Sequence, residues 1–307
     1  MKKILIVTLA AMLALSCLAF SACSGETVDP GQTPGGSQAE NNAATPDNMI
    51  NCYIAFSGTS YTATDSSAIR VDGSALTITK PGTYDISGTL DNGQIIVEVT
   101  KADRVTLILN NFTGHNESSA VIWVKSADKV YLEVKTGTTN TLTDGATYVF
   151  ENPADTKPNA CIYASDDLSI KGHGTLIVTG NYNNGIGCKN DLSINNCKLT
   201  VSAVNNAIKG NGSVTIKGEA EVLVEGAEDA IKSDSLDVGK GFLLITEKAK
   251  VTVHCEDDGL QATQDITVTT GATVTTYAKG DAVNCDGTAT IDQGCLVENV
   301  PDGAVTE

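Results

Sequence analysis

Arginine, aromatic residues and long apolar segments are all scarce in this chain of 307 residues. Aromatic residues make up 5% of it, and arginine occurs only at Arg70 and Arg104. After residue 50 no segment shows helical periodicity of useful length, and none is apolar enough to span a bilayer. The chain has 29 Gly and seven Pro. This composition favours an all-β fold of short strands and turns over packed helices.

The first 22 residues have the pattern of an export signal. Two lysines precede an apolar stretch over residues 4–20, and the small residues Ser21 and Ala22 form a cleavage site before Cys23. The tetrapeptide F-S-A-C resembles a lipoprotein box, which predicts that Cys23 is acylated and anchors the exported protein to the cell membrane. A second interpretation is a plain secretory signal with an incidental cysteine.

Residues 23–49 are rich in Gly, Pro, Ser and Asn and predict a flexible linker before a folded domain over 50–307. Removal of residues 1–22 leaves 18 basic residues against 37 acidic ones, a formal charge of −19. That charge disfavours nucleic acid and anionic membranes as partners and favours cations. We therefore expect no nucleic-acid partner and membrane contact only through the lipid anchor. The export signal predicts an extracellular protein, and we expect it to be a monomer.

Seven cysteines remain outside the export segment, at positions 52, 161, 188, 197, 255, 285 and 295. An odd number without paired spacing argues against a disulfide framework, and no C-x-x-C pattern indicates zinc. We interpret these residues as small buried side chains. A disulfide between Cys52 and another cysteine near the N-terminal end of the fold is the exception left open.

A short motif recurs in the second half of the chain, as in G-A-E-D-A-I-K-S-D at 226–234. Successive copies of its aliphatic position lie 24, 22, 23, 29 and 23 residues apart. The position is occupied by Ile162, Ile186, Ile208, Ile231, Leu260 and Val283. Two further alternating apolar segments follow each copy, so each repeat contains three short strands separated by Gly, Asn and Asp turns.

Three strands per repeat of 22–24 residues predict a parallel β-helix over residues 50–307. Its expected hand is right-handed, because parallel crossovers almost always are. Residues 104–109 and 129–134 resemble earlier rungs, residues 238–242 form a loop inserted into the 29-residue repeat, and 148–159 are an excursion from the coil. A β-sandwich is the alternative, but it would not align like residues in columns.

The segment N-A-C-I-Y-A-S-D-D-L-S-I-K-G-H-G-T-L-I-V-T-G-N-Y-N-N-G-I at 159–186, followed by N-A-I-K-G and D-A-I-K-S-D, resembles a bacterial family. This is the family of cell-surface carbohydrate-binding domain-containing proteins, and the resemblance spans about residues 70–290. It implies a right-handed parallel β-helix that carries calcium and binds polygalacturonate-type pectin and cellulose. The implied architecture is similar to that of calcium-dependent pectate lyases. The family's turns usually read D-D-G-I or G-D-G-I-K, whereas two repeats here carry Asn-Asn, which implies fewer metal sites in the first rungs.

Polar pairs precede each aliphatic position and would stack about 4.8 Å apart in a β-helix. Stacked carboxylates repel one another, and calcium, which takes six to eight oxygen ligands, would remove that repulsion. The other interpretation is that Asn and Asp occupy these turns because they tolerate a left-handed backbone. Residue types alone support both equally; the resemblance favours calcium at five acidic residues, namely Glu228, Asp229, Asp257, Asp258 and Asp281.

One position after the aliphatic residue, side chains must point out of the coil. That column reads Trp123, Tyr163, Gly187, Lys209, Lys232, Gln261 and Asn284. Aromatic rings stack on sugars and lysines pair with uronate carboxylates, so we predict that Trp123, Tyr163, Lys209 and Lys232 bind substrate. The alternative is a solvated face on which the lysines neutralise neighbouring acids.

The sequence thus predicts a cell-surface, calcium-dependent protein that binds acidic plant polysaccharide of the polygalacturonate or pectin type, with cellulose as a second candidate. The alternative is a calcium-assisted pectate lyase in which Lys209 or Lys232 removes the uronate C5 proton. The scarcity of arginine argues against it, because little else would stabilise the intermediate. A third hypothesis is a structural surface protein without a carbohydrate ligand.

Overall fold

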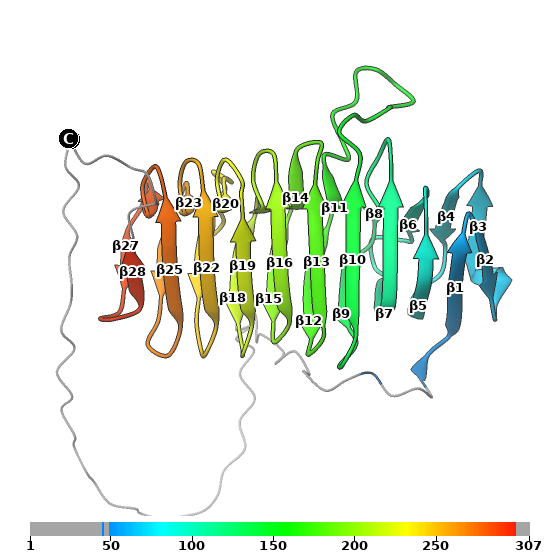
Figure 1. The fold of residues 1–307 in the computed structure, drawn as a ribbon, viewed down its shortest axis with the longest axis horizontal. Coiled ribbons are helices and arrows are strands. Elements are labelled where there is room, and N and C mark those ends of the chain that lie inside the picture. Colours follow the sequence, from blue (N-terminus) through cyan, green and yellow to red (C-terminus); the bar gives the residue numbers. More distant parts are fainter. Residues whose placement is uncertain (1–44, 46–48, 299–307) are drawn as a thin grey trace, which may run out of the picture. The chain divides into compact units, whose positions relative to one another are not determined.

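The computed structural model describes residue 45 and residues 49–298, and nearly all regular structure in this part of the chain is β-strand. The strands lie one beside the next along a coil (Figure 1). Helical structure in the described part is limited to short 3-10 turns such as Ser66–Ala68. The all-β prediction is confirmed, and the parallel pairing is that of a β-helix-like coil.

The strands pair in three columns. The first column runs through β4 (Ala75–Ile78), β6 (Gln94–Glu98), β8 (Ile122–Ser126), β11 (Ala160–Ala164), β14 (Asn184–Cys188), β17 (Ile208–Gly210), β20 (Ile231–Ser233), β23 (Leu260–Ala262) and β26 (Val283–Cys285). The second runs through β5 (Gly82–Leu90), β7 (Arg104–Asn116), β9 (Lys129–Val134), β12 (Asp167–Gly172), β15 (Asp191–Asn195), β18 (Ser213–Lys217), β21 (Phe242–Ile245), β24 (Ile266–Val268) and β27 (Ala289–Ile291). The third runs from the second half of β7 through β10 (Thr139–Asp144), β13 (Thr175–Gly180), β16 (Lys198–Ala203), β19 (Glu221–Glu225), β22 (Lys250–Cys255), β25 (Thr273–Ala278) and β28 (Leu296–Glu298).

The register of the first column follows the intervals read from the sequence. The aliphatic positions pair directly, in the order Ile162, Ile186, Ile208, Ile231, Leu260 and Val283. The early rungs also pair as expected, since residues 104–109 of β7 lie parallel to β9. The right-handed sense of the coil stays a prediction.

The interior of the coil is filled by the inward side chains of all three columns. Ile186 and Ile208 have no exposed surface, and Ile231 has 1%. Full burial of such a side chain stabilises the fold by roughly 1.5–3 kcal/mol. Backbone bonds join successive rungs, as in the 2.9 Å bond from the Ile186 N–H to the Ala207 carbonyl. Stability therefore accumulates rung by rung along the axis.

Antiparallel strands occur at the N-terminal end of the coil. There β1 (Cys52–Gly58) pairs with β2 (Ser60–Ala63), and β3 (Ile69–Asp72) pairs with β4. β1 also continues the second column by parallel pairing with β5. The rings of Phe56 and Phe112 lie 5.6 Å apart in this region. The larger aromatic side chains thus fill the end where the repeats are least regular.

Two connections leave the regular coil where the sequence predicts them. Residues 234–241 lie between β20 and β21, within the longest repeat, and residues 145–159 project between β10 and β11 (Figure 1). The second connection is anchored at Tyr148, whose hydroxyl donates to Asp144 at 2.6 Å and whose ring stacks on Tyr182 at 4.0 Å. Its last residues, Lys157 to Asn159, run directly into β11.

All seven cysteines of the described part are buried and none is joined in a disulfide, so the prediction of small buried side chains is confirmed and the exception left open for Cys52 does not occur. The Cys188 thiol donates to the Asp166 carbonyl at 3.1 Å. Burial raises the pKa of both Cys188 and Cys197 to about 12. Neither thiol is poised to react as a thiolate at neutral pH.

The predicted signal (1–22), Cys23 and most of the predicted linker (23–49) lie outside the described residues. Thr45 is the one member of the linker, besides Met49, whose position is described. Its N–H and hydroxyl donate to the Glu133 carboxylate at 2.9 and 2.6 Å. Within the described residues, no helix has the length and apolarity needed to cross a bilayer.

Truncation of one rung anchor tests the core. Ile208→Ala leaves a cavity in a fully buried position and should lower the free energy of unfolding by about 2–5 kcal/mol. Lys198→Ala, on an outward position of the third column, should change it by less than about 0.5 kcal/mol. Denaturant unfolding followed by circular dichroism measures both, and an equal effect of the two changes would contradict the inward assignment of Ile208.

Thiol chemistry tests the burial of the cysteines. The native protein should react slowly with a thiol reagent at neutral pH, because the thiols are covered and burial raises their pKa values. Unfolding should expose seven additional reactive thiols. Rapid labelling of any of the seven in the native protein, located by peptide mass spectrometry, would show that its rung opens.

Candidate functional site

The outward positions of the first column form one row, which we call the outward row. Direct strand pairing aligns Trp123, Tyr163, Gly187, Lys209, Lys232, Gln261 and Asn284 in that order. Successive members of this row are separated by about 4.8 Å, the spacing of paired strands. All four predicted substrate-binding residues therefore lie on one face of the coil.

The aromatic end of the row is partly covered. Trp123 is half-buried, with the Lys125 ammonium 4.2 Å from its ring centroid. Tyr163 is only 5% exposed, because it packs with Ala120 and Ala160. Burial raises the pKa of its phenol to about 12. Tyr163 is therefore a wall of the site rather than an open ring on which a sugar could lie flat.

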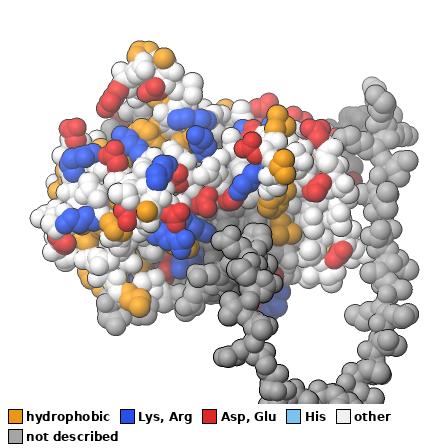
Figure 2. Space-filling model, turned by 180° about the vertical axis from the view of Figure 1, so that it is seen from behind, with side chains coloured by type: hydrophobic (Ala, Val, Ile, Leu, Met, Phe, Trp, Pro, Cys, Tyr) orange, Lys and Arg blue, Asp and Glu red, His pale blue; other side chains and the backbone are white. Residues whose placement is uncertain are grey.

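Both predicted lysines form ion pairs with nearby carboxylates. The Lys209 ammonium lies 2.6 Å from Asp234, and the Lys232 ammonium lies 2.9 Å from Asp229. This is the neutralising arrangement that the sequence left open as an alternative to substrate binding. The opposite side of the coil from that in Figure 1 shows basic side chains gathered with acidic ones between them (Figure 2).

The turn residues before the first column form two hydrogen-bond ladders. In the first, the Asn206 amide donates to the Asn184 side-chain oxygen at 2.8 Å. In the second, Asp229 accepts from the Asp258 N–H at 3.3 Å, and Asp258 accepts from the Asp281 N–H at 2.9 Å. The Asn pairs therefore stack, as the turn interpretation predicts, while the acids form a separate group further along the coil.

Three of the five predicted calcium ligands converge. One carboxylate oxygen from each of Asp229, Asp257 and Asp258 lies within 4.8 Å of the others. Asp229 and Asp258 are 5% exposed, whereas Asp257 is exposed. The charge of neighbouring Asp258, slight desolvation, and the charges of Asp229 and Glu228 raise the pKa of Asp257. We call these three residues the acid cluster.

The acid cluster has three carboxylates at a spacing that one calcium ion could bridge. Oxygens that share one calcium ion, each about 2.3–2.6 Å from it, can be at most about 5 Å apart, and the cluster meets that condition. Neighbouring side chains already contact part of it: Gln261 and Asn284 donate to Asp258 at 3.0 and 2.6 Å. Asp257 is the exposed member of the cluster and is therefore the candidate ligand most accessible to a cation from solvent.

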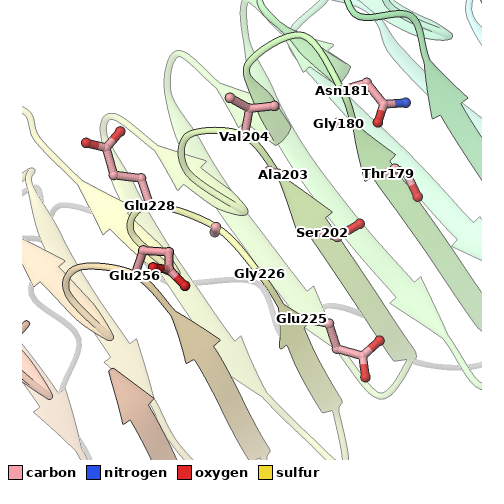
Figure 3. A pocket seen from close by; sticks show the side chains of 11 residues that line it. Thr179, Gly180, Asn181, Ser202, Ala203, Val204, Glu225, Gly226, Glu228 and Glu256 are labelled. Carbon is pink, nitrogen blue, oxygen red and sulfur yellow. The ribbon is translucent and has the colours of Figure 1, made fainter. Parts of the chain in front are cut away.

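Glu228 and Asp281, the other two predicted ligands, are exposed and lie outside the acid cluster. Glu228 lines an open groove of about 520 Å³ together with Glu225, Glu256 and the exposed Val204. Glu228 and Glu256 come from neighbouring turns and point in different directions (Figure 3). The sequence pattern correctly placed Glu228 among the polar pairs that precede the aliphatic positions. It could not show which way the longer Glu side chain points.

Several residues of the site were missed by the sequence reasoning. Asp234, the partner of Lys209, begins an inserted loop and so has no counterpart in the other repeats. Lys157 approaches Tyr163 from the projecting connection, with its ammonium 5.4 Å from the ring centroid. No periodic signal could have found either one. Gln261 and Asn284 did appear in the outward column, which was the available hint that they contact the acids.

Comparison with known proteins places these features in a family. The family model described as "Carbohydrate-binding domain-containing protein" matches residues 72–294. A protein of that description from Acetivibrio thermocellus is 37% identical over 282 residues, covering 92% of this chain and 94% of its own length. A solved structure, "Structure of the polysaccharide lyase-like protein from C. thermocellum, Gadolinium derivative", is 40% identical, with a TM-score of 0.78. The match covers 81% of this chain and all of that one.

The pH dependence of calcium stabilisation tests the acid cluster. The raised pKa of Asp257 means that the folded state holds this proton more tightly than the unfolded state, so without calcium the repulsion is relieved as pH falls. Calcium competes with the proton, so the rise in melting temperature that calcium causes should be full at pH 7. It should decline before the pH reaches about 4, the ordinary pKa of Asp.

The matched variants are Asp257→Asn, which removes one charge from the cluster, and Asp72→Asn, which removes one from the exposed strand β3. At a calcium concentration of 100 times Kd, binding stabilises the folded protein by about 2.7 kcal/mol. Asp257→Asn should lose most of that gain and Asp72→Asn should keep it. An unchanged calcium response in Asp257→Asn would place the cation elsewhere.

Proposed function

The chain belongs to the carbohydrate-binding domain-containing protein family, and we propose that it binds acidic plant polysaccharide at the cell surface in a calcium-dependent manner. The proposed ligand is a polygalacturonate or pectin chain, with cellulose as a second candidate. The observation that carries the proposal is the acid cluster of Asp229, Asp257 and Asp258, which lies beside the outward row.

Electrostatics explains why calcium would strengthen binding of the proposed ligand. The chain has a formal charge of −17, and a polyuronate is also an anion, so the two repel on average. Asp229, Asp257 and Asp258 would hold a calcium ion, which supplies positive charge with coordination positions open to sugar oxygens. The solved relative is a gadolinium derivative, and gadolinium is also a hard cation that prefers oxygen ligands. Lys232, paired with Asp229, holds the carboxylate side of this site in place.

The proposed location follows from the N-terminal sequence. The export signal and the lipoprotein box imply that the mature chain begins at Cys23 and is attached to the membrane by lipid there. The linker of residues 23–49 would then join the lipid anchor to the coil. A binding protein in this position would hold polysaccharide close to the cell as a monomer.

The lyase alternative has one observation in its favour. Lys232 lies beside the acid cluster, where a base would stand next to a metal ion in a metal-assisted proton abstraction. However, the two arginines are engaged elsewhere: Arg70 pairs with Glu98 and Arg104 with Asp128, at 2.8 and 2.7 Å. No described arginine is therefore placed to stabilise an enolate-like intermediate next to the cluster.

Binding to immobilised polygalacturonate, with and without a calcium chelator, tests the proposal directly. Chelation should reduce binding at least about tenfold, which corresponds to about 1.4 kcal/mol. Lys209→Ala combined with Lys232→Ala should weaken binding to polygalacturonate, and Trp123→Ala should weaken binding to both polygalacturonate and cellulose. The matched control is Lys198→Ala with Lys248→Ala, which removes two ion-paired lysines away from the outward row.

The same incubation distinguishes binding from cleavage. A lyase would release unsaturated products that absorb in the ultraviolet, and a binding protein would release none. Retention of polygalacturonate binding in chelator, at high salt and in all three outward-row substitutions would overturn the proposed face. Steady accumulation of unsaturated product would instead support the lyase.

A further inference from the structure

A second hollow, of about 350 Å³, lies on the outward row where Gly187 stands between Tyr163 and Lys209. The row leaves a gap there because glycine has no side chain. A Cβ at this position would lie 3.1 Å from the Ala160 Cβ and 3.2 Å from the Tyr163 ring. Any other residue would therefore begin to fill the space. We call it the Gly187 hollow.

The Gly187 hollow is lined by lysines and by no acid. Lys157, Lys189 and Lys209 contribute to its walls, and its other lining residues are neutral. This is unexpected by composition, because acidic residues outnumber basic ones by 37 to 20 in the chain. Asp234, a carboxylate outside the lining, is paired with Lys209 at 2.6 Å. The net local charge is therefore positive within an acidic protein.

Lys157 is the residue of the hollow that most favours an anionic ligand. It pairs with no carboxylate among the described residues, and its ammonium faces the ring of Tyr163. Partial burial and the charge of Lys209 lower its pKa, with Asp234 opposing them. The connection before β11 thus brings the Lys157 ammonium near enough to Lys209 for the two positive charges to repel each other. An anion between the two would remove that cost.

The hollow also has neutral donors suited to a sugar. The side chains of Asn159 and Asn211 and the hydroxyl-bearing Ser165 line it beside the lysines. Its volume is at the small end of ligand pockets, which span roughly 300–1,000 Å³. It can therefore admit one unit of a chain but not a long segment. An acidic sugar fits this lining, because its carboxylate can pair with the lysines and its hydroxyls can form hydrogen bonds with the amide side chains.

We propose that the Gly187 hollow is a subsite for one acidic sugar unit, whose carboxylate lies between Lys157 and Lys209. The proposal rests on the proposed function and adds to it a point of contact that needs no calcium. The acid cluster begins two rungs further along the row, about 10 Å away. A single sugar unit cannot reach both, whereas an oligomer can, and linking two contacts strengthens binding beyond either alone.

Titration calorimetry with trigalacturonate in the presence of a calcium chelator tests the subsite. Wild-type protein should bind, and Lys157→Gln should bind about tenfold more weakly because a charged hydrogen bond is lost. Gly187→Ala should weaken binding by filling the hollow, and its melting temperature shows whether it folds. Lys248→Gln removes the same charge from the pair with Glu219, far from the hollow, and should bind like the wild type. Neutral cellotriose should not respond to Lys157→Gln.

The outcomes separate the subsite from the proposed function. Equal trigalacturonate affinity in wild type and Lys157→Gln overturns the subsite, and so does binding that requires calcium; in both cases the calcium-dependent function stands. Failure of wild-type protein to bind trigalacturonate or polygalacturonate, with or without calcium, overturns both. Two results together would support both the subsite and the proposed function. Trigalacturonate should bind in the presence of chelator and bind more weakly to Lys157→Gln, and calcium should increase the affinity only for longer oligomers.

Discussion

The fold depends on one constraint: parallel hydrogen bonding places equivalent positions of successive repeats directly beside one another, about 4.8 Å apart. A residue at one position of a repeat therefore contacts the residue at the same position of the next repeat. For aliphatic residues this is favourable on every rung, which is why Ile186, Ile208 and Ile231 form a continuous buried row. For polar residues, stacking is favourable only where the side chain can form a hydrogen bond with an identical side chain in the next rung.

Asparagine and aspartate differ in this respect within the same column of turns. An asparagine amide both donates and accepts, so Asn184 and Asn206 bond to each other. An aspartate can only accept, so Asp229 and Asp258 take N–H groups from the next rung and further donors from Lys232, Gln261 and Asn284. The change from Asn to Asp along the column replaces a ladder in which side chains bond to each other with one that draws its donors from backbone N–H groups and from other side chains.

The same constraint sets what the sequence could predict. Periodicity located the core positions and aligned the outward row, because both follow from one repeat placed beside the next. It could not reveal the covering of Tyr163 or the approach of Lys157, since the connection before β11 occurs once and has no equivalent in other repeats. Nor could it show that Glu228 lines the open groove and lies outside the acid cluster, because a long side chain on an exposed turn is not fixed by register.

Binding an acidic polymer with an acidic protein requires positive charge at separate, defined points, and the proposed function draws it from two sources: the lysines of the outward row and a cation at the acid cluster beside it. The attraction between a lysine and the anionic polymer is electrostatic and weakens with salt. At physiological ionic strength, exposed charges more than about 8 Å apart are largely screened from each other. A cation held by Asp229, Asp257 and Asp258 would instead contact the oxygens of the polymer directly and would respond to chelation and to pH. Elsewhere the excess of carboxylates repels the polymer. The acidic composition therefore does not oppose the proposed function; it confines binding to the part of the coil where compensating charge is held.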